Sequence, residues 1–114
     1  MVNVVGDHAT YHLKYNAPLT SDLDNLAKSV SDWVGRSNSV DDLCDLGNEA
    51  WQNANAFPGQ ISTLIVPADC AWGDFKGDIP QPLEKIKPSA IDHSLVSESI
   101  ETLKLDGSIL FIGG

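Results

Sequence analysis

The sequence predicts an α/β protein with a mainly parallel sheet and helices on both faces of that sheet. Strand-like apolar runs alternate with amphipathic segments, in the order strand, helix, short strand, helix, strand, linker, helix, strand. Such alternation is typical of parallel sheets. The first and last runs, residues 2–5 and 108–114, are apolar on both faces, as strands in the middle of a parallel sheet are. With 114 residues, 42% of them hydrophobic, the chain can bury one modest core.

The first third of the chain contains a strand, a helix and a short strand. The opening strand ends at Gly6, and a polar loop follows to about residue 20. Ser21 and Asp24 have the spacing of a capping box, which predicts that a helix starts there. A short strand is expected near Trp33-Val34. The helix before it is predicted from apolar residues at helical spacing, namely Leu23, Leu26, Ala27 and Val30.

A second helix and the clearest strand follow. Ser39 and Asp42 form another capping box, and Pro58-Gly59 marks the turn after the helix. The strand 61–66 is rich in β-branched residues and is bounded by that turn and by Pro67. The predicted apolar face of the helix consists of Leu43, Leu46, Ala50, Trp51 and Ala54.

The composition changes after Trp72. Residues 73–88 contain two glycines and three prolines with charged residues between them, which predicts a partly extended linker. Ser89 with Asp92 is a third capping box, and Asp106-Gly107 turns the chain into a final strand. The last helix is predicted from Ile91, Leu95, Val96, Ile100 and Leu103.

This order predicts a domain boundary at the linker. Residues 1–73 would form one unit, 74–88 the linker, and 89–114 the start of a second domain. Termini of complete domains usually lie at the surface, so core strands at both extremes suggest an incomplete sheet cut from a larger multidomain protein. We therefore expect incomplete covering of Leu23, Leu26, Leu64 and Ile65, and either self-association through exposed sheet edges or loose packing of the chain.

Composition excludes some classes of function. The net charge is -9, from 16 acidic and 7 basic residues, which argues against binding of nucleic acid or anionic membranes. No apolar run approaches the roughly 20 residues that span a bilayer, and no signal peptide is visible. Cys44 and Cys70 match no CxxC or zinc spacing. We expect buried, reduced thiols in a cytoplasmic protein.

Chemistry is expected on loops at the carboxyl ends of the strands, where open α/β sheets bind ligands. The loop 6–16 holds an acid, a lysine, two tyrosines and the histidines His8 and His12. Histidine suits proton transfer near neutral pH. The i, i+4 spacing would also suit a metal if the segment were helical, but no third ligand is apparent. A polar loop whose rings pack on a neighbour is the alternative.

The loop 66–73 is the second candidate. Asp69 is expected to cap the following turn, and Trp72 to cover the sheet edge. No Walker loop, GxGxxG fingerprint, GxSxG elbow or zinc motif is present.

Several of these segments together resemble thiamine-diphosphate-dependent enzymes of the acetolactate synthase and pyruvate oxidase type. In that family a strand ends in Gly plus a polar residue, and later a "PGPV" turn leads to a strand ending in "VP-x-D". Here Gly6-Asp7-His8, Pro58-Gly59-Gln60-Ile61 and Val66-Pro67-Ala68-Asp69 stand in those places. The resemblance covers about residues 2–73 and continues more weakly to residues 109–114, which are similar to the first strand of the family's central domain.

The resemblance implies a function. Residues 1–73 would be the C-terminal part of the pyrimidine-binding domain, with Gly6 and Asp7 near the cofactor and His8 and His12 as acid/base groups by analogy. The full-length enzyme would be a homo-oligomer, a dimer or tetramer, that uses thiamine diphosphate with Mg²⁺ on a 2-oxo acid. The resemblance leaves open whether the enzyme binds FAD. The family's catalytic glutamate and its "GDG…N" magnesium motif lie outside this segment, so the chain alone is expected to be inactive.

One alternative stands beside this hypothesis. A small acidic α/β module could also serve as a free-standing binding or interaction domain without catalysis, its sheet edges paired by a partner.

Overall fold

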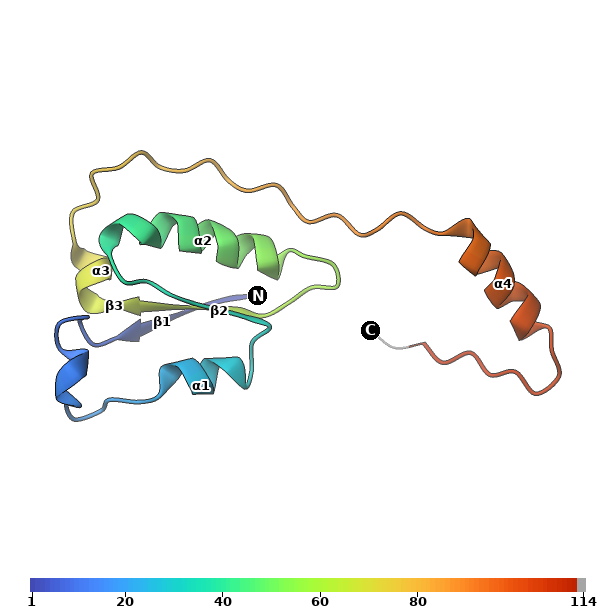
Figure 1. The fold of residues 1–114 in the computed structure, drawn as a ribbon, viewed down its shortest axis with the longest axis horizontal. Helices are drawn as coiled ribbons and strands as arrows, with labels where there is room; N and C mark the ends of the chain where they lie inside the picture. Colours follow the sequence, from blue (N-terminus) through green and yellow to red (C-terminus); the bar gives the residue numbers. More distant parts are fainter. Residues whose placement is uncertain (113–114) are drawn as a thin grey trace.

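The computed structural model describes residues 1–112 and consists of a three-stranded parallel sheet between helices (Figure 1). The strands are β1 (Val2–Asp7), β2 (Trp33–Arg36) and β3 (Ser62–Pro67), in the order β1-β3-β2. α1 (Leu23–Lys28) lies on one face and α2 (Val40–Ala54) on the other. The predicted α/β class with a parallel sheet is therefore confirmed.

The core lies between β3 and α2. Every residue of β3 is buried, because β3 has a strand on each side and a helix on each face. On the α2 side, Leu64, Val66 and Cys70 pack with Ala50, and Trp33, Leu43 and Leu46 border this cluster. The expectation that Leu64 and Ile65 lack full covering is wrong, since they are 4% and 0% exposed. Leu26 is exposed, as expected.

β1 is an edge strand, so the prediction of a buried strand there is wrong. It pairs with β3 in continuous parallel register from Val2↔Ser62 to Asp7↔Pro67, and its residues alternate between exposed and half-buried. Apolar residues on both faces do not guarantee a central position, because burial also needs a neighbour on the second edge. Within residues 1–112, no strand pairs with that edge.

The predicted N-cap residue is confirmed for α2. At α1 and α4 the N-cap is a different residue from the predicted one. Ser39 caps α2 and accepts a hydrogen bond from the Asp42 N–H at 3.3 Å. Helix α1 is capped by Asp22 rather than Ser21, and α4 (His93–Leu103) by Asp92 rather than Ser89. Aspartate caps as well as serine does, and its charge also interacts favourably with the helix dipole.

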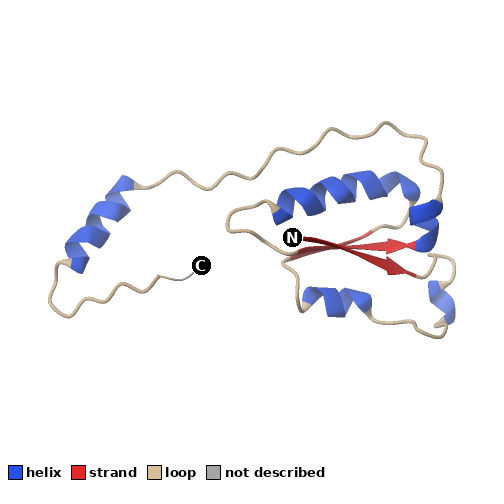
Figure 2. Cartoon of the chain, turned by 180° about the vertical axis from the view of Figure 1, so that it is seen from behind, coloured by secondary structure: helices blue, strands red, loops and turns tan. Residues whose placement is uncertain are grey.

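The chain after α3 (Ala68–Trp72) leaves the sheet. Residues 73–92 form no helix or strand and run along α2 toward α4 (Figure 2). The Asn48 side-chain amide donates to the Gln81 carbonyl at 3.1 Å, and that of Gln52 donates to the Glu84 carbonyl at 2.8 Å. The segment is therefore tied to α2. The proposed domain boundary in this linker stays a prediction.

α4 and the residues after it pack on nothing else that the structure describes. All residues from 81 to 112 are exposed. The radius of gyration is 20.7 Å, against about 13 Å for a compact chain of this length. The predicted final strand is wrong over residues 108–112, which are not paired; its last residues, 113–114, lie outside the described range.

Two further findings bear on the sequence predictions. Both cysteines are free thiols; Cys70 is buried, as expected, and Cys44 is half-buried. Among the helices within residues 1–112, none has the length and hydrophobicity needed to cross a bilayer.

Candidate functional site

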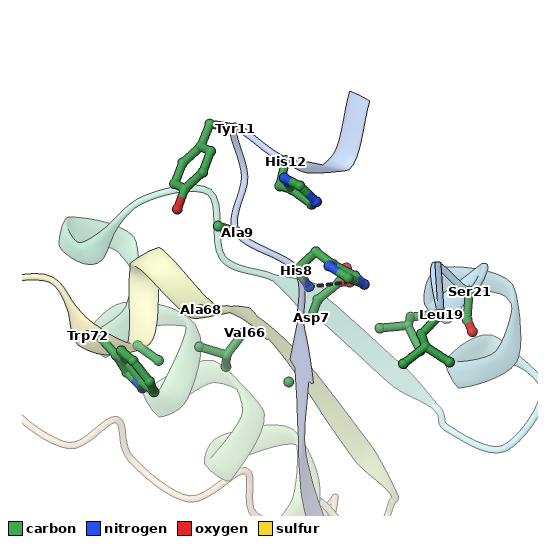
Figure 3. A pocket seen from close by; sticks show the side chains of 13 residues that line it. Asp7, His8, Ala9, Tyr11, His12, Leu19, Ser21, Val66, Ala68 and Trp72 are labelled. Atoms are coloured by element: carbon green, nitrogen blue, oxygen red, sulfur yellow. Dashed lines mark hydrogen bonds between the residues drawn. The ribbon is translucent and has the colours of Figure 1, made fainter. Parts of the chain in front are cut away.

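A cleft of about 610 Å³ opens at the carboxyl ends of β1 and β3 (Figure 3). The loop after β1 forms one wall, and α3 with the end of β3 forms the other. The polar lining side chains are Asp7, His8, Tyr11, His12 and Ser21, and the larger apolar ones are Leu19, Leu23, Val66 and Trp72. This is the position at which open α/β sheets bind ligands.

Asp7 fixes the start of the loop. One of its carboxylate oxygens accepts a hydrogen bond from the His8 backbone N–H at 2.7 Å, and the other accepts from the Arg36 guanidinium at 2.5 Å. The Asp7 side chain is only 5% exposed. A carboxylate this buried needs a paired charge, and Arg36 supplies it from the end of β2.

Arg36 also joins α1 to the sheet. Its guanidinium donates two hydrogen bonds to Asp24, at 3.1 and 2.7 Å. These bonds lower the pKa of the Asp24 carboxyl. The bonds to Asp24, and secondarily that to Asp7, raise the pKa of Arg36. One cation therefore holds β1, β2 and α1 together, and of this group Asp7 lines the cleft.

Thr10 and Asp69 fasten the middle of the loop to α3. The Asp69 carboxylate accepts the Thr10 backbone N–H at 2.9 Å and the Thr10 hydroxyl at 2.5 Å. The hydroxyl bond, followed by the backbone bond, lowers the pKa of Asp69. Asp69 was expected to cap the turn after β3, but Pro67 occupies the cap position. The carboxylate bonds a distant loop instead.

His8 and His12 lie together at the mouth of the cleft. Their rings stack with centroids 5.6 Å apart and an interplanar angle of 21°, and both residues are half-buried. His12 also contacts Tyr15, whose ring lies 5.0 Å from the Lys14 ammonium. Half-buried imidazoles at a cleft can donate protons to a bound molecule or accept protons from it.

The structure gathers all four predicted site residues, Gly6, Asp7, His8 and His12, around this cleft. Their roles as catalytic or cofactor-binding groups stay predictions. The arrangement does not match the helical metal site considered for the two histidines, since His12 only caps a short 3-10 helix, η1 (Leu13–Tyr15). Within residues 1–112, no three His, Cys, Asp or Glu side chains converge as a metal site requires.

Sequence reasoning missed Arg36 and the pairing of Thr10 with Asp69. Arg36 is the sole arginine in the sequence, and it stands at the end of a short strand. A single arginine at a strand end was the signal in the sequence that could have identified Arg36 as part of the site. Trp72 was expected to cover the sheet edge, but it is 88% exposed and borders the cleft.

A comparison with curated proteins matches part of this sequence to a named relative. Over 74 residues, which are 65% of this chain, the sequence is 53% identical to a protein of Mycobacterium tuberculosis (strain ATCC 25618 / H37Rv) named "Putative acetolactate synthase large subunit IlvX". The chain is similar to an acetolactate-synthase-like protein. It spans 14% of the length of that relative.

The other comparisons add no further relatives. No protein-family profile matches the chain, and no solved structure matches it. The acetolactate-synthase-like relationship therefore depends on the mycobacterial relative, and it agrees with the resemblance that the strand ends indicated.

Proposed function

We propose that this chain is part of a thiamine-diphosphate-dependent, acetolactate-synthase-like enzyme that makes or breaks a bond next to the carbonyl of a 2-oxo acid. In this proposal residues 1–73 belong to the pyrimidine-binding domain and residues 89–114 open the central domain. The observation that carries it is the 53% identity over 74 residues to the mycobacterial relative. The cleft at the carboxyl ends of β1 and β3 supports it.

The lining of the cleft suits one end of this cofactor. A pyrimidine ring is planar and has polar edges, and the cleft offers apolar contacts from Leu19, Val66 and Trp72 beside the polar groups of His8 and Ser21. Leu19 and Trp72 would hold the faces of the ring. Thiamine diphosphate supplies the carbanion chemistry when bound. The Mg²⁺ and diphosphate sites are proposed for other parts of the longer enzyme, and FAD binding stays open.

The loop residues would then act in two ways. His8 and His12 would hold or move protons at their ring nitrogens, next to the bound substrate. Asp7 and Asp69 would position them, because one fixes the His8 backbone and the other fixes Thr10, between the two histidines. We further propose that the enzyme is a cytoplasmic homo-oligomer.

A chimera tests the cofactor assignment. The 74 matched residues of the mycobacterial relative are replaced by those of this chain. Binding of thiamine diphosphate with Mg²⁺ is then measured by calorimetry for the relative, the chimera and the isolated chain. We expect the relative and the chimera to bind similarly and the isolated chain to show no measurable binding.

Each other outcome contradicts a part of the proposal. If the relative binds the cofactor and the chimera does not, this segment does not form part of the cofactor site. A relative that does not bind would remove the cofactor assignment. Micromolar binding by the isolated chain would show that the other domains are not essential.

The histidines are tested in the same chimera. If either acts as a general acid or base, His8→Ala or His12→Ala should lower kcat by about 10²–10⁴-fold, with little change in thermal unfolding. Tyr15→Phe is the control, since Tyr15 contacts His12 but does not line the cleft. Full activity of both alanine variants would favour the polar-loop alternative.

A further inference from the structure

Arg36 bonds to residues at both ends of the loop that carries the two histidines. Asp7 ends β1 directly before this loop, and Asp24 lies in the first turn of α1 directly after it. The Arg36 guanidinium donates to Asp7 through one terminal nitrogen, and to Asp24 through Nε and the other terminal nitrogen. One side chain therefore holds together the two ends of the loop 8–22, as in a compact surface loop.

Arg36 reaches across the middle strand to make these bonds. β1 and β2 pair with opposite edges of β3, and neighbouring strands lie about 4.8 Å apart. Leu64 packs on the α2 side of the sheet, so Ile65 and the residue opposite it in β2, Arg36, face the α1 side. Asp7 lies on the same face as Ile65, because the residue two before it, Val5, is opposite Ile65 in the register. A long side chain on this face spans the distance from β2 to β1.

The two carboxylates that Arg36 contacts lie in different surroundings. The Asp7 side chain is 5% exposed, whereas that of Asp24 is 45% exposed. The second oxygen of Asp7 accepts the His8 backbone N–H at 2.7 Å. Asp7 and His8 both line the cleft, and Asp24 does not. The bond to Asp7 therefore connects Arg36 with the cleft, and the bonds to Asp24 connect it with α1.

Arg36 determines how the Asp7 carboxylate is oriented. A hydrogen bond between a guanidinium and a carboxylate is charge-assisted and strong, and a buried carboxylate requires such a partner. With Oδ2 held by Arg36 at 2.5 Å, Oδ1 is directed at the His8 N–H. Without the guanidinium, the charged carboxylate is expected to turn toward water and to release the His8 backbone.

His8 lies between two such carboxylate anchors. Asp7 holds its backbone on one side (Figure 3), and Asp69 holds the backbone N–H and the hydroxyl of Thr10 on the other. The His8 ring stacks on His12 at a centroid distance of 5.6 Å. The position of the ring therefore depends on the backbone that these anchors fix.

We propose that Arg36 is a positioning residue that holds His8 at the cleft through Asp7, while Asp24 anchors the guanidinium itself. Arg36 does not line the cleft, so it acts through His8 rather than on a bound molecule. This inference rests on the proposed function, because the positioning of His8 contributes to a reaction only when His8 holds or moves a proton there.

The geometry is tested in this chain by nuclear magnetic resonance. Arg36→Lys keeps the positive charge but removes the planar fork that bonds two carboxylates at once. Asp24→Asn is the matched control, because it changes the other partner of the same guanidinium and keeps an oxygen that accepts its hydrogen bonds. We expect a nuclear Overhauser contact between the His8 and His12 rings in the wild type and in Asp24→Asn, and its loss in Arg36→Lys. An equal contact in all three proteins, or none in the wild type, would overturn the proposal.

The effect on the reaction is tested in the chimera described above. Release of carbon dioxide from pyruvate, used as the probe 2-oxo acid, gives kcat and KM. Arg36→Lys should lower kcat about 10- to 100-fold with little change in KM, because small displacements of a catalytic group reduce the rate by such factors. Asp24→Asn should keep kcat within about twofold of the unsubstituted chimera.

A double substitution separates positioning from folding. In a chimera that also carries His8→Ala, Arg36→Lys should still lower the melting temperature, but it should no longer lower kcat, because the side chain that it positions is absent. An equal loss of kcat with and without His8 would mean that Arg36 acts through the stability of the fold, and this result would overturn the proposal.

The outcomes also distinguish this inference from the proposed function. An active chimera in which Arg36→Lys leaves kcat unchanged contradicts the inference alone. Full activity of His8→Ala contradicts the proposed role of His8 and, with it, the contribution of Arg36 to the reaction. The ring contact in this chain measures the positioning independently of activity, so its loss in Arg36→Lys beside a fully active His8→Ala would show that Arg36 positions a histidine that is not catalytic.

Discussion

The two halves of this chain have similar local sequence patterns but very different environments. α2 and α4 are both capped and both amphipathic, yet α2 contributes Ala50 to the core whereas α4 has no buried residue. Similarly, β3 is fully buried and residues 108–112 are fully exposed. The difference shows that an apolar pattern identifies a face that is suited to burial. Which element buries that face depends on the topology of the chain.

The largest contrast is expected between buried and exposed isoleucines. Ile65→Ala should lower the free energy of unfolding by about 2–5 kcal/mol, because Ile65 is 0% exposed and its removal leaves a cavity. Ile100→Ala in α4 should change it by less than about 0.5 kcal/mol in dilute samples. Urea unfolding followed by circular dichroism measures both. Equal effects would mean that α4 packs on the rest of the chain.

Ion pairs provide a second contrast. Arg36→Ala leaves the buried Asp7 carboxylate unpaired and should destabilise the fold by about 1–3 kcal/mol. Lys104→Ala breaks the exposed pair with Glu101, and exposed pairs contribute about 1 kcal/mol or less. If Asp7→Asn restored no stability to Arg36→Ala, the unpaired charge would not be the cause.

Low pH should lower the free energy of unfolding, because the carboxyls of Asp24 and Asp69 become protonated. The pKa of each carboxyl is lowered in the folded state, by Arg36 and by Thr10 respectively. The unfolded chain therefore binds more protons than the folded chain as the pH falls. The stabilisation from these two carboxylates is fully present above about pH 4, the ordinary aspartate pKa, and is lost as the pH falls through the pKa of the folded state. Thr10→Val should flatten this dependence in melting curves recorded between about pH 5 and 2. An unchanged slope would contradict the role of the Thr10 bonds.

The sequence predicted the class of fold and the place of the cleft, because both follow from short-range patterns. Alternating strands and helices imply parallel pairing, and the ends of such strands meet at one edge. The strand order did not follow, so β1 was expected to be central although it lies at an edge. Thr10 with Asp69, and Arg36 with Asp7, are contacts across long separations. Single residues give no signal of such partners before the sheet brings them together.

Hydrogen exchange tests most directly whether residues 1–72 form a packed unit to which α4 does not belong. We expect the amides of β3, all of whose residues are buried, to be protected from exchange. The amides of α4, which has no buried residue, should exchange rapidly in dilute samples. Protection of α4 in dilute samples, or rapid exchange in β3, would contradict this account.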